Sequence, residues 1–93
     1  MNVMNINEAL LITQEECAEV SQAISKVFRF GMDTKWNNLS NKAHLEEELG
    51  DLLAMIEILM NCDVVSEREV NLAKAAKIWK LKKWSGVFNE RSQ

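Results

Sequence analysis

The sequence predicts a small all-α fold built from about three helices. Its 93 residues contain no proline and only three glycines, a composition that suits long helices joined by short turns. Three stretches carry apolar residues at the three- and four-residue spacing of an amphipathic helix, and no strand pattern remains. A chain of this length forms a single domain, 1–93, and buries a modest fraction of its surface. We therefore expect homo-oligomerisation to complete the bundle as a multi-helix layer.

The first helix is predicted over about 8–30. Asn7 is the expected N-cap, and Glu8 follows in the first turn, where the helix dipole favours an acid. Gly31 is placed to end the helix in a left-handed conformation. The core-facing stripe comprises Leu10, Cys17, Val20, Ile24, Val27 and Phe28.

A polar loop rich in asparagine is predicted between the first two helices. It is longer than a helix–helix turn requires, and long loops that carry an aromatic residue are often functional. Trp36, together with Phe28 or Phe30, could form a stacking surface for a nucleobase, or it could fold back over the core. Asn37 and Asn38 could contact base edges or simply form turns.

Two further helices are predicted over about 41–61 and 67–84. Ser40 or Asn41 is expected to cap the first of these. Ser66, followed three residues later by a glutamate, matches a capping box at the start of the last helix.

The charge is unevenly distributed, although the net charge is only −3. Residues 44–57 are strongly acidic, whereas the stretch 74–83 has no acid and carries Lys74, Lys77, Lys80, Lys82 and Lys83. The lysines could bind a polyanion or form a solvated helix face. Because the total charge is acidic, no nucleic acid is expected as a partner.

The chain carries no sign of a membrane or secreted protein. No apolar run approaches the length of a membrane span, and the N-terminus lacks the pattern of a secretory signal. Cys17 and Cys62 have neither a redox nor a zinc spacing, and two buried thiols are favoured over a disulfide. We expect a cytoplasmic protein without a membrane partner.

Two pairs of acidic residues border the apolar stripes of the first two helices. Glu16 and Glu19 are three residues apart, as are Glu48 and Asp51, so each pair lies on one side of its helix. If the two rows face each other, four carboxylates come together, and such close like charges repel unless a cation lies among them. Oxygen ligands favour Mg²⁺, with Mn²⁺ as a substitute. The alternative is two solvated helix faces.

The acid pairs also carry a family resemblance. EECAE at 15–19 followed by ELGD at 48–51 resembles the EExxE and ExxD signature of the all-α nucleoside triphosphate pyrophosphohydrolases, the MazG-like superfamily. EECAEVSQAISKVFRFG followed by ELGDLLAMIEIL is most similar to the short single-domain MazG-like proteins of bacteriophage and bacterial genomes. The resemblance covers roughly residues 10–85.

The resemblance implies Mg²⁺-dependent hydrolysis of a ribo- or deoxyribonucleoside triphosphate to the monophosphate and pyrophosphate, for nucleotide pool cleaning or control of dNTP levels. It matches four residues to the metal ligands: Glu16, Glu19, Glu48 and Asp51. Glu15 matches a fifth catalytic acid, which helps to hold a second metal or orients the attacking water. The candidate substrate-binding residues are Lys77 and Lys80 on the last helix, then Lys26, Arg29 and Trp36. A homo-dimer or tetramer is also implied.

A different class of function is a non-catalytic helical interaction module. In that case the acids form a solvated or partner-binding face, and the lysines bind an acidic partner. Nucleic-acid binding through the lysines would show affinity that falls steeply with salt. His44, the only histidine, could bond a phosphate or a ligand acid, whereas a histidine in the first turn of a helix is more often a surface residue.

Overall fold

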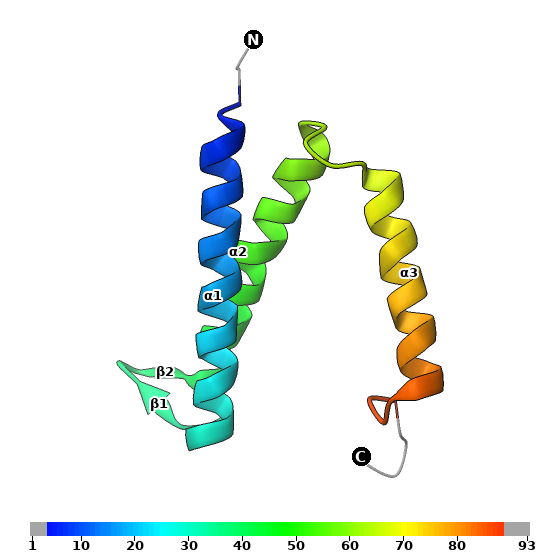
Figure 1. Ribbon diagram of the computed structural model, residues 1–93. Helices are drawn as coiled ribbons and strands as arrows, with labels where there is room; N and C mark the ends of the chain where they lie inside the picture. Colours follow the sequence, from blue (N-terminus) through cyan, green and yellow to red (C-terminus); the bar gives the residue numbers. More distant parts are fainter. Residues whose placement is uncertain (1–3, 89–93) are drawn as a thin grey trace.

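A computed structural model of the protein describes residues 4–88 and confirms the all-α fold class (Figure 1). Its helices are α1 at Ile6–Phe30, α2 at Asn41–Asn61 and α3 at Glu67–Trp84. The predicted bounds of α2 and α3 are confirmed, and α1 begins two residues earlier than predicted. Ser66 caps α3 as expected, because its side chain accepts a hydrogen bond from the backbone N–H of Glu69.

The two ends of α1 differ in detail from the prediction. Asn5, not Asn7, is the N-cap, and its side chain accepts a hydrogen bond of 3.0 Å from the backbone N–H of Glu8. The sequence offers an asparagine at both positions, and the earlier one adds a further half-turn of helix. At the other end Gly31 has the predicted positive φ of 91°, but its ψ of 159° is extended. The chain therefore leaves α1 directly toward a strand.

A short β-hairpin lies where the sequence predicts a loop without strands. Strands β1 at Lys35–Trp36 and β2 at Leu39–Ser40 pair antiparallel, with Trp36 opposite Leu39. Asn37 and Asn38 connect them, and both have a positive φ, of 52° and 68°. Two successive left-handed residues are the requirement of a type I′ turn, and asparagine tolerates that conformation well. The two asparagines therefore form a turn.

Asn41 anchors this hairpin to the end of α1. It is 1% exposed, and its side-chain amide donates a hydrogen bond of 2.8 Å to the carbonyl of Gly31. Its backbone N–H donates to the carbonyl of Thr34 at 2.8 Å. Ser40 is the N-cap of α2 and accepts from the N–H of Ala43. These bonds fix where α2 begins relative to the end of α1.

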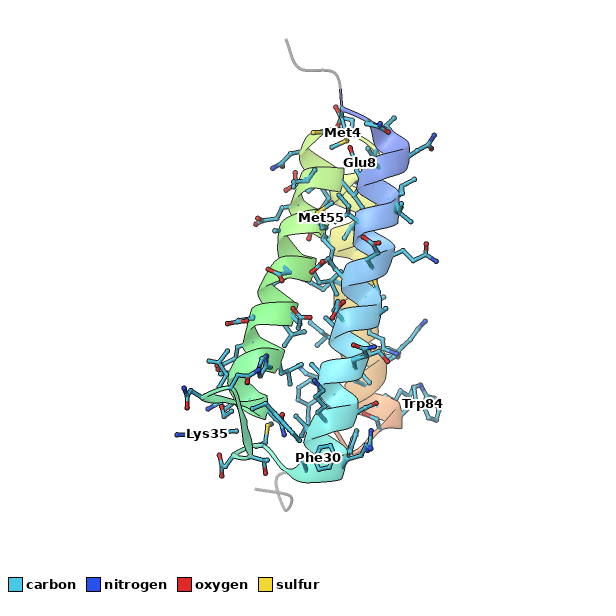
Figure 2. All side chains as sticks on the ribbon, turned by 90° about the vertical axis from the view of Figure 1, so that its left-hand side faces the viewer. Met4, Glu8, Phe30, Lys35, Met55 and Trp84 are labelled. Carbon is cyan, nitrogen blue, oxygen red and sulfur yellow. The ribbon has the colours of Figure 1, made fainter. Side chains whose placement is uncertain are left out.

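α1 and α2 form an antiparallel pair that contains most of the tertiary contacts of the described chain (Figure 1). Ala9 and Ala23 of α1 and Leu59 of α2 are the buried apolar residues among residues 4–88. The two alanines leave little side chain between the helix backbones, so α1 and α2 can approach closely. Figure 2 shows this pair from the side, with Phe30 and Lys35 at the hairpin end and Glu8 at the other.

α3 stands apart from this pair (Figure 1). Within the described chain none of its residues is buried, and Trp79 and Trp84 are 60% and 76% exposed. The radius of gyration is 16.3 Å, whereas a compact domain of this length has about 12 Å. A single copy is thus open and leaves much apolar surface in water.

The same openness makes two predictions wrong. Leu10, Ile24 and Phe28 of the predicted core-facing stripe are exposed, and the two cysteines are not buried. Cys17 and Cys62 are free thiols, as expected, but both are exposed instead of buried. Cys17 lies on a stripe that α2 covers only in part, and Cys62 follows the end of α2, where α3 turns away.

Among residues 4–88 no helix has both the length and the apolar character needed to cross a membrane.

Candidate metal centre

Three of the predicted acids meet where α1 and α2 face each other. Glu16 comes from α1, and Glu48 and Asp51 come from successive turns of α2. One carboxylate oxygen of each lies within 4.8 Å of the others. The three-residue spacing on α2 puts both of its acids on the side that meets α1. The sequence-based expectation that the acidic rows face each other is therefore correct for these three.

Glu16 is the most constrained of the three acids. It is half-buried, and its Oε2 atom is fully buried with no hydrogen-bond partner among residues 4–88. Burial raises the pKa of Glu16, and the neighbouring charges of Asp51 and Glu19 raise it further. A buried carboxylate oxygen without a donor is costly, so the geometry calls for a cation or a proton at this point.

Glu48 has the same electrostatic character. Partial burial raises its pKa first, and the proximity of Glu19 and then of Asp51 adds to the effect. Glu48 therefore lies between an acid of α1 and an acid of its own helix. Each ionised carboxylate makes the next one harder to ionise.

The group suits a hard divalent cation. All three side chains offer oxygen, and Mg²⁺ or Mn²⁺ is bound by carboxylate oxygens together with water and substrate oxygens. A cation here would cancel the mutual repulsion and would give the buried Oε2 of Glu16 a partner. The residues present therefore fit a divalent metal site with room for further ligands.

The other two predicted acids lie at the edge of this group. Glu19 is close enough to Glu48 to raise its pKa, but its carboxylate is not within the tight group of three. Glu15 is exposed, and its charge contributes to the raised pKa of Glu16. Both therefore border the group of three without belonging to it.

The predicted substrate-binding residues fall into two sets. Lys26 lies near the acids, because it lines a small cavity of about 100 Å³ together with Glu19 and Glu48. Lys77 and Lys80 lie on α3, which does not pack on the acidic group within one copy (Figure 1). A single chain thus does not bring the lysines of the last helix to the acids.

Arg29 and Trp36 gather around Phe30 at the hairpin end of α1. The guanidinium carbon of Arg29 lies 5.0 Å from the centre of the Phe30 ring. Trp36 meets the same ring edge-to-face, with the ring centres 5.5 Å apart. Trp36 is 44% exposed, so it forms an aromatic surface rather than a core residue.

The cavity beside the acids also contains Gln22 and Ala23, which the sequence did not single out, and His44, for which the sequence left a phosphate contact and a surface position open. Gln22, Ala23 and His44 line it along with Lys26 and the two glutamates. The sequence contains a signal for Gln22 and His44 at this place, because Gln22 follows Glu19 by three residues and His44 precedes Glu48 by four. Gln22 and His44 therefore each lie one turn along the helix from one of the predicted acids.

The family was identified by comparison with known proteins. The family model described as the MazG nucleotide pyrophosphohydrolase domain matches residues 5–84. The chain belongs to this family. The matched segment contains α1, α2 and α3 together with all five predicted catalytic acids. No curated protein and no solved structure matched the chain. For a MazG domain the acidic group between α1 and α2 indicates nucleotide pyrophosphohydrolase chemistry.

Proposed function

We propose that this single-domain MazG protein hydrolyses ribo- or deoxyribonucleoside triphosphates to the monophosphate and pyrophosphate in the cytoplasm. Glu16, Glu19, Glu48 and Asp51 are the proposed ligands of Mg²⁺, for which Mn²⁺ can substitute. The observation that carries the proposal is the group of three carboxylates around the partnerless Oε2 of Glu16, in a chain of this family. Pool cleaning or control of dNTP levels would be its role.

The reaction needs no covalent nucleophile. Water attacks the α-phosphorus, the bond from that phosphorus to the bridging oxygen breaks, and pyrophosphate leaves with the bonding electron pair. A bound divalent cation supplies charge neutralisation and a lowered water pKa. The four proposed ligands hold the cation, and Glu15 helps to hold a second cation or orients the attacking water by accepting a hydrogen bond from it. The proton that this water loses is released to solvent.

A nucleotide panel tests the proposal directly. We expect the purified protein to convert at least one ribo- or deoxyribonucleoside triphosphate to monophosphate and pyrophosphate when Mg²⁺ is present. EDTA should stop the reaction, and added Mg²⁺ or Mn²⁺ should restore it. Products are separated by ion-exchange chromatography. Diphosphate and inorganic phosphate as products would contradict the proposal, and no turnover by folded protein would favour the interaction module.

We further propose that the protein is a homo-oligomer, a dimer or tetramer. The support is the open shape of one copy and the apolar groove of about 510 Å³ between α2 and α3, whose lining includes Leu53, Ile56, Met60, Val70 and Ala73. Exposed apolar side chains continue along α1 at Leu10, Leu11 and Ile24. Burying this surface against a second copy would supply the core that one copy lacks.

In the assembly, the lysines of α3 are proposed to reach the acidic group of a neighbouring copy. α3 carries five lysines, while the facing regions of α1 and α2 are acidic, so the two surfaces are complementary in charge. Lys77 and Lys80 would then bind the phosphates that the metal alone does not neutralise. The separation of α3 from the acids of its own copy supports an arrangement between copies.

Mixed oligomers test this arrangement. Glu48→Gln subunits and Lys77→Gln/Lys80→Gln subunits are each expected to be inactive alone. Mixed in equal amounts, they should recover about a quarter of the wild-type activity of a dimer, because one site in each hybrid is intact. Light scattering after size exclusion gives the mass. No recovery in hybrids of confirmed composition would mean that each lysine serves its own copy.

A further inference from the structure

Two hollows of opposite character flank the acidic group along the groove between α1 and α2. One contains Gln22, Lys26 and His44 and shares Glu19 and Glu48 with the acids. The other contains Ile12, Ala54 and Met55 and shares Glu16 and Asp51. The metal site therefore has a polar, cationic side toward the hairpin end of α1 and an apolar side toward the start of α1.

We propose that these hollows set the direction of the bound nucleotide. Lys26 and His44 hold the two terminal phosphates, which leave as pyrophosphate, and the nucleoside lies on the apolar side at Ile12 and Met55. The inference rests on the proposed pyrophosphohydrolase function and adds to it the residues that bind each end of the substrate.

The helix geometry explains the polar hollow. Glu19, Gln22, Ala23 and Lys26 recur at three- and four-residue intervals and form one face of α1. Ala23 is 6% exposed, and its small side chain leaves the space that the longer neighbours surround. His44, half-buried in the first turn of α2, closes the opposite wall.

The donors in this hollow suit phosphate oxygens. The Lys26 ammonium offers three N–H groups, Gln22 offers an amide NH₂ and the His44 imidazole offers at least one N–H. A phosphate chain cannot extend along carboxylates that hold no cation, because the charges repel. Beyond the metal it must therefore turn toward the side where positive charge and neutral donors are found.

The cationic character continues away from the acids. An adjoining hollow of about 420 Å³ shares Gln22 and Lys26 and adds Ser21, Ser25 and Arg29. Ser21, Ser25 and Arg29 follow one another at four-residue spacing on the neighbouring row of α1, and Arg29 lies about one turn beyond Lys26. The apolar hollow has no such donors, since Ile12, Ala54 and Met55 offer only apolar contact.

Product binding tests the direction independently of turnover. Titration calorimetry with Mg²⁺ present measures the affinity for pyrophosphate and, separately, for the monophosphate of the best substrate. We expect Lys26→Gln and His44→Gln each to weaken pyrophosphate binding about tenfold, with monophosphate binding changed less than about twofold. We expect Met55→Asn to weaken binding of the monophosphate and to leave binding of pyrophosphate nearly unchanged.

Lys42→Gln is the matched control. Lys42 is exposed, lies two residues from His44 and does not line the hollow, so its loss of charge should leave both affinities unchanged. Circular dichroism verifies that every variant keeps its helices. Weakened monophosphate binding with unchanged pyrophosphate binding in Lys26→Gln would overturn the proposal, as it would place the nucleoside toward Trp36. Equal losses in Lys42→Gln would also overturn it. Wild-type turnover on the nucleotide panel decides the proposed function separately.

Discussion

Glu48→Gln is expected to abolish Mg²⁺-dependent turnover while leaving the three helices folded. Glu48 belongs to the group of three carboxylates and lies between Asp51 on its own helix and Glu19 on α1. A neutral amide in this place removes one negative charge from the metal site, and we expect activity to fall at least about 100-fold. Initial rates at increasing Mg²⁺ concentration measure the loss, and circular dichroism measures the helices.

Glu47→Gln is the matched control for this variant. Glu47 precedes Glu48 on α2, is exposed and lies outside the group of three, yet its replacement removes the same charge. Its turnover should stay within about twofold of the wild type, as expected for a surface substitution. Full activity in Glu48→Gln, or an equal loss in both variants, would show that the group between α1 and α2 is not the metal site.

Periodicity was sufficient to predict the helices of this protein because the signals are local. The caps Ser40 and Ser66 lie next to apolar repeats of helical spacing, and both α2 and α3 begin directly after them. The error at the start of α1 came from two asparagines of equal propensity, Asn5 and Asn7. The hairpin was missed because each strand has two residues, too few to show an alternating pattern.

The site could be predicted only in part, because the packing of α1 on α2 decides which of its acids come close together. The spacing of Glu48 and Asp51 places both on one side of α2, but the angle between α1 and α2 decides which acid of α1 meets them. In the structure Glu16 joins Glu48 and Asp51 in the tight group, while Glu19 lies at its edge beside Glu48. Lys77 lies on α3, which does not pack on the acidic group in the described chain, so neither the sequence nor the structure of one chain brings it to the acids.

The stability of the metal-free protein is expected to depend on pH through the same acids. The pKa values of Glu16 and Glu48 are raised in the folded state, so both carboxyl groups bind protons more tightly there than in the unfolded chain. Their stabilising effect is therefore complete below the ordinary carboxyl pKa and is lost as the pH rises through the raised values. At neutral pH the ionised acids oppose folding.

Glu48→Gln isolates this effect, because glutamine resembles a protonated glutamate in shape and charge. In EDTA at pH 7.5 the variant should unfold at a higher temperature than the wild type, and the difference should vanish near pH 4. With Mg²⁺ at pH 7.5 the wild type should instead unfold at a higher temperature than Glu48→Gln, because only the wild type keeps the full set of acids for the cation. At a hundred times its dissociation constant it adds about 2.7 kcal/mol, which corresponds to roughly 10 °C or more for a domain of this size. Scanning calorimetry with and without Mg²⁺ measures both differences. A metal-free variant no more stable than the wild type at pH 7.5 would mean that the carboxylates of α1 and α2 do not repel one another, and the case for a cation between them would lose its electrostatic basis.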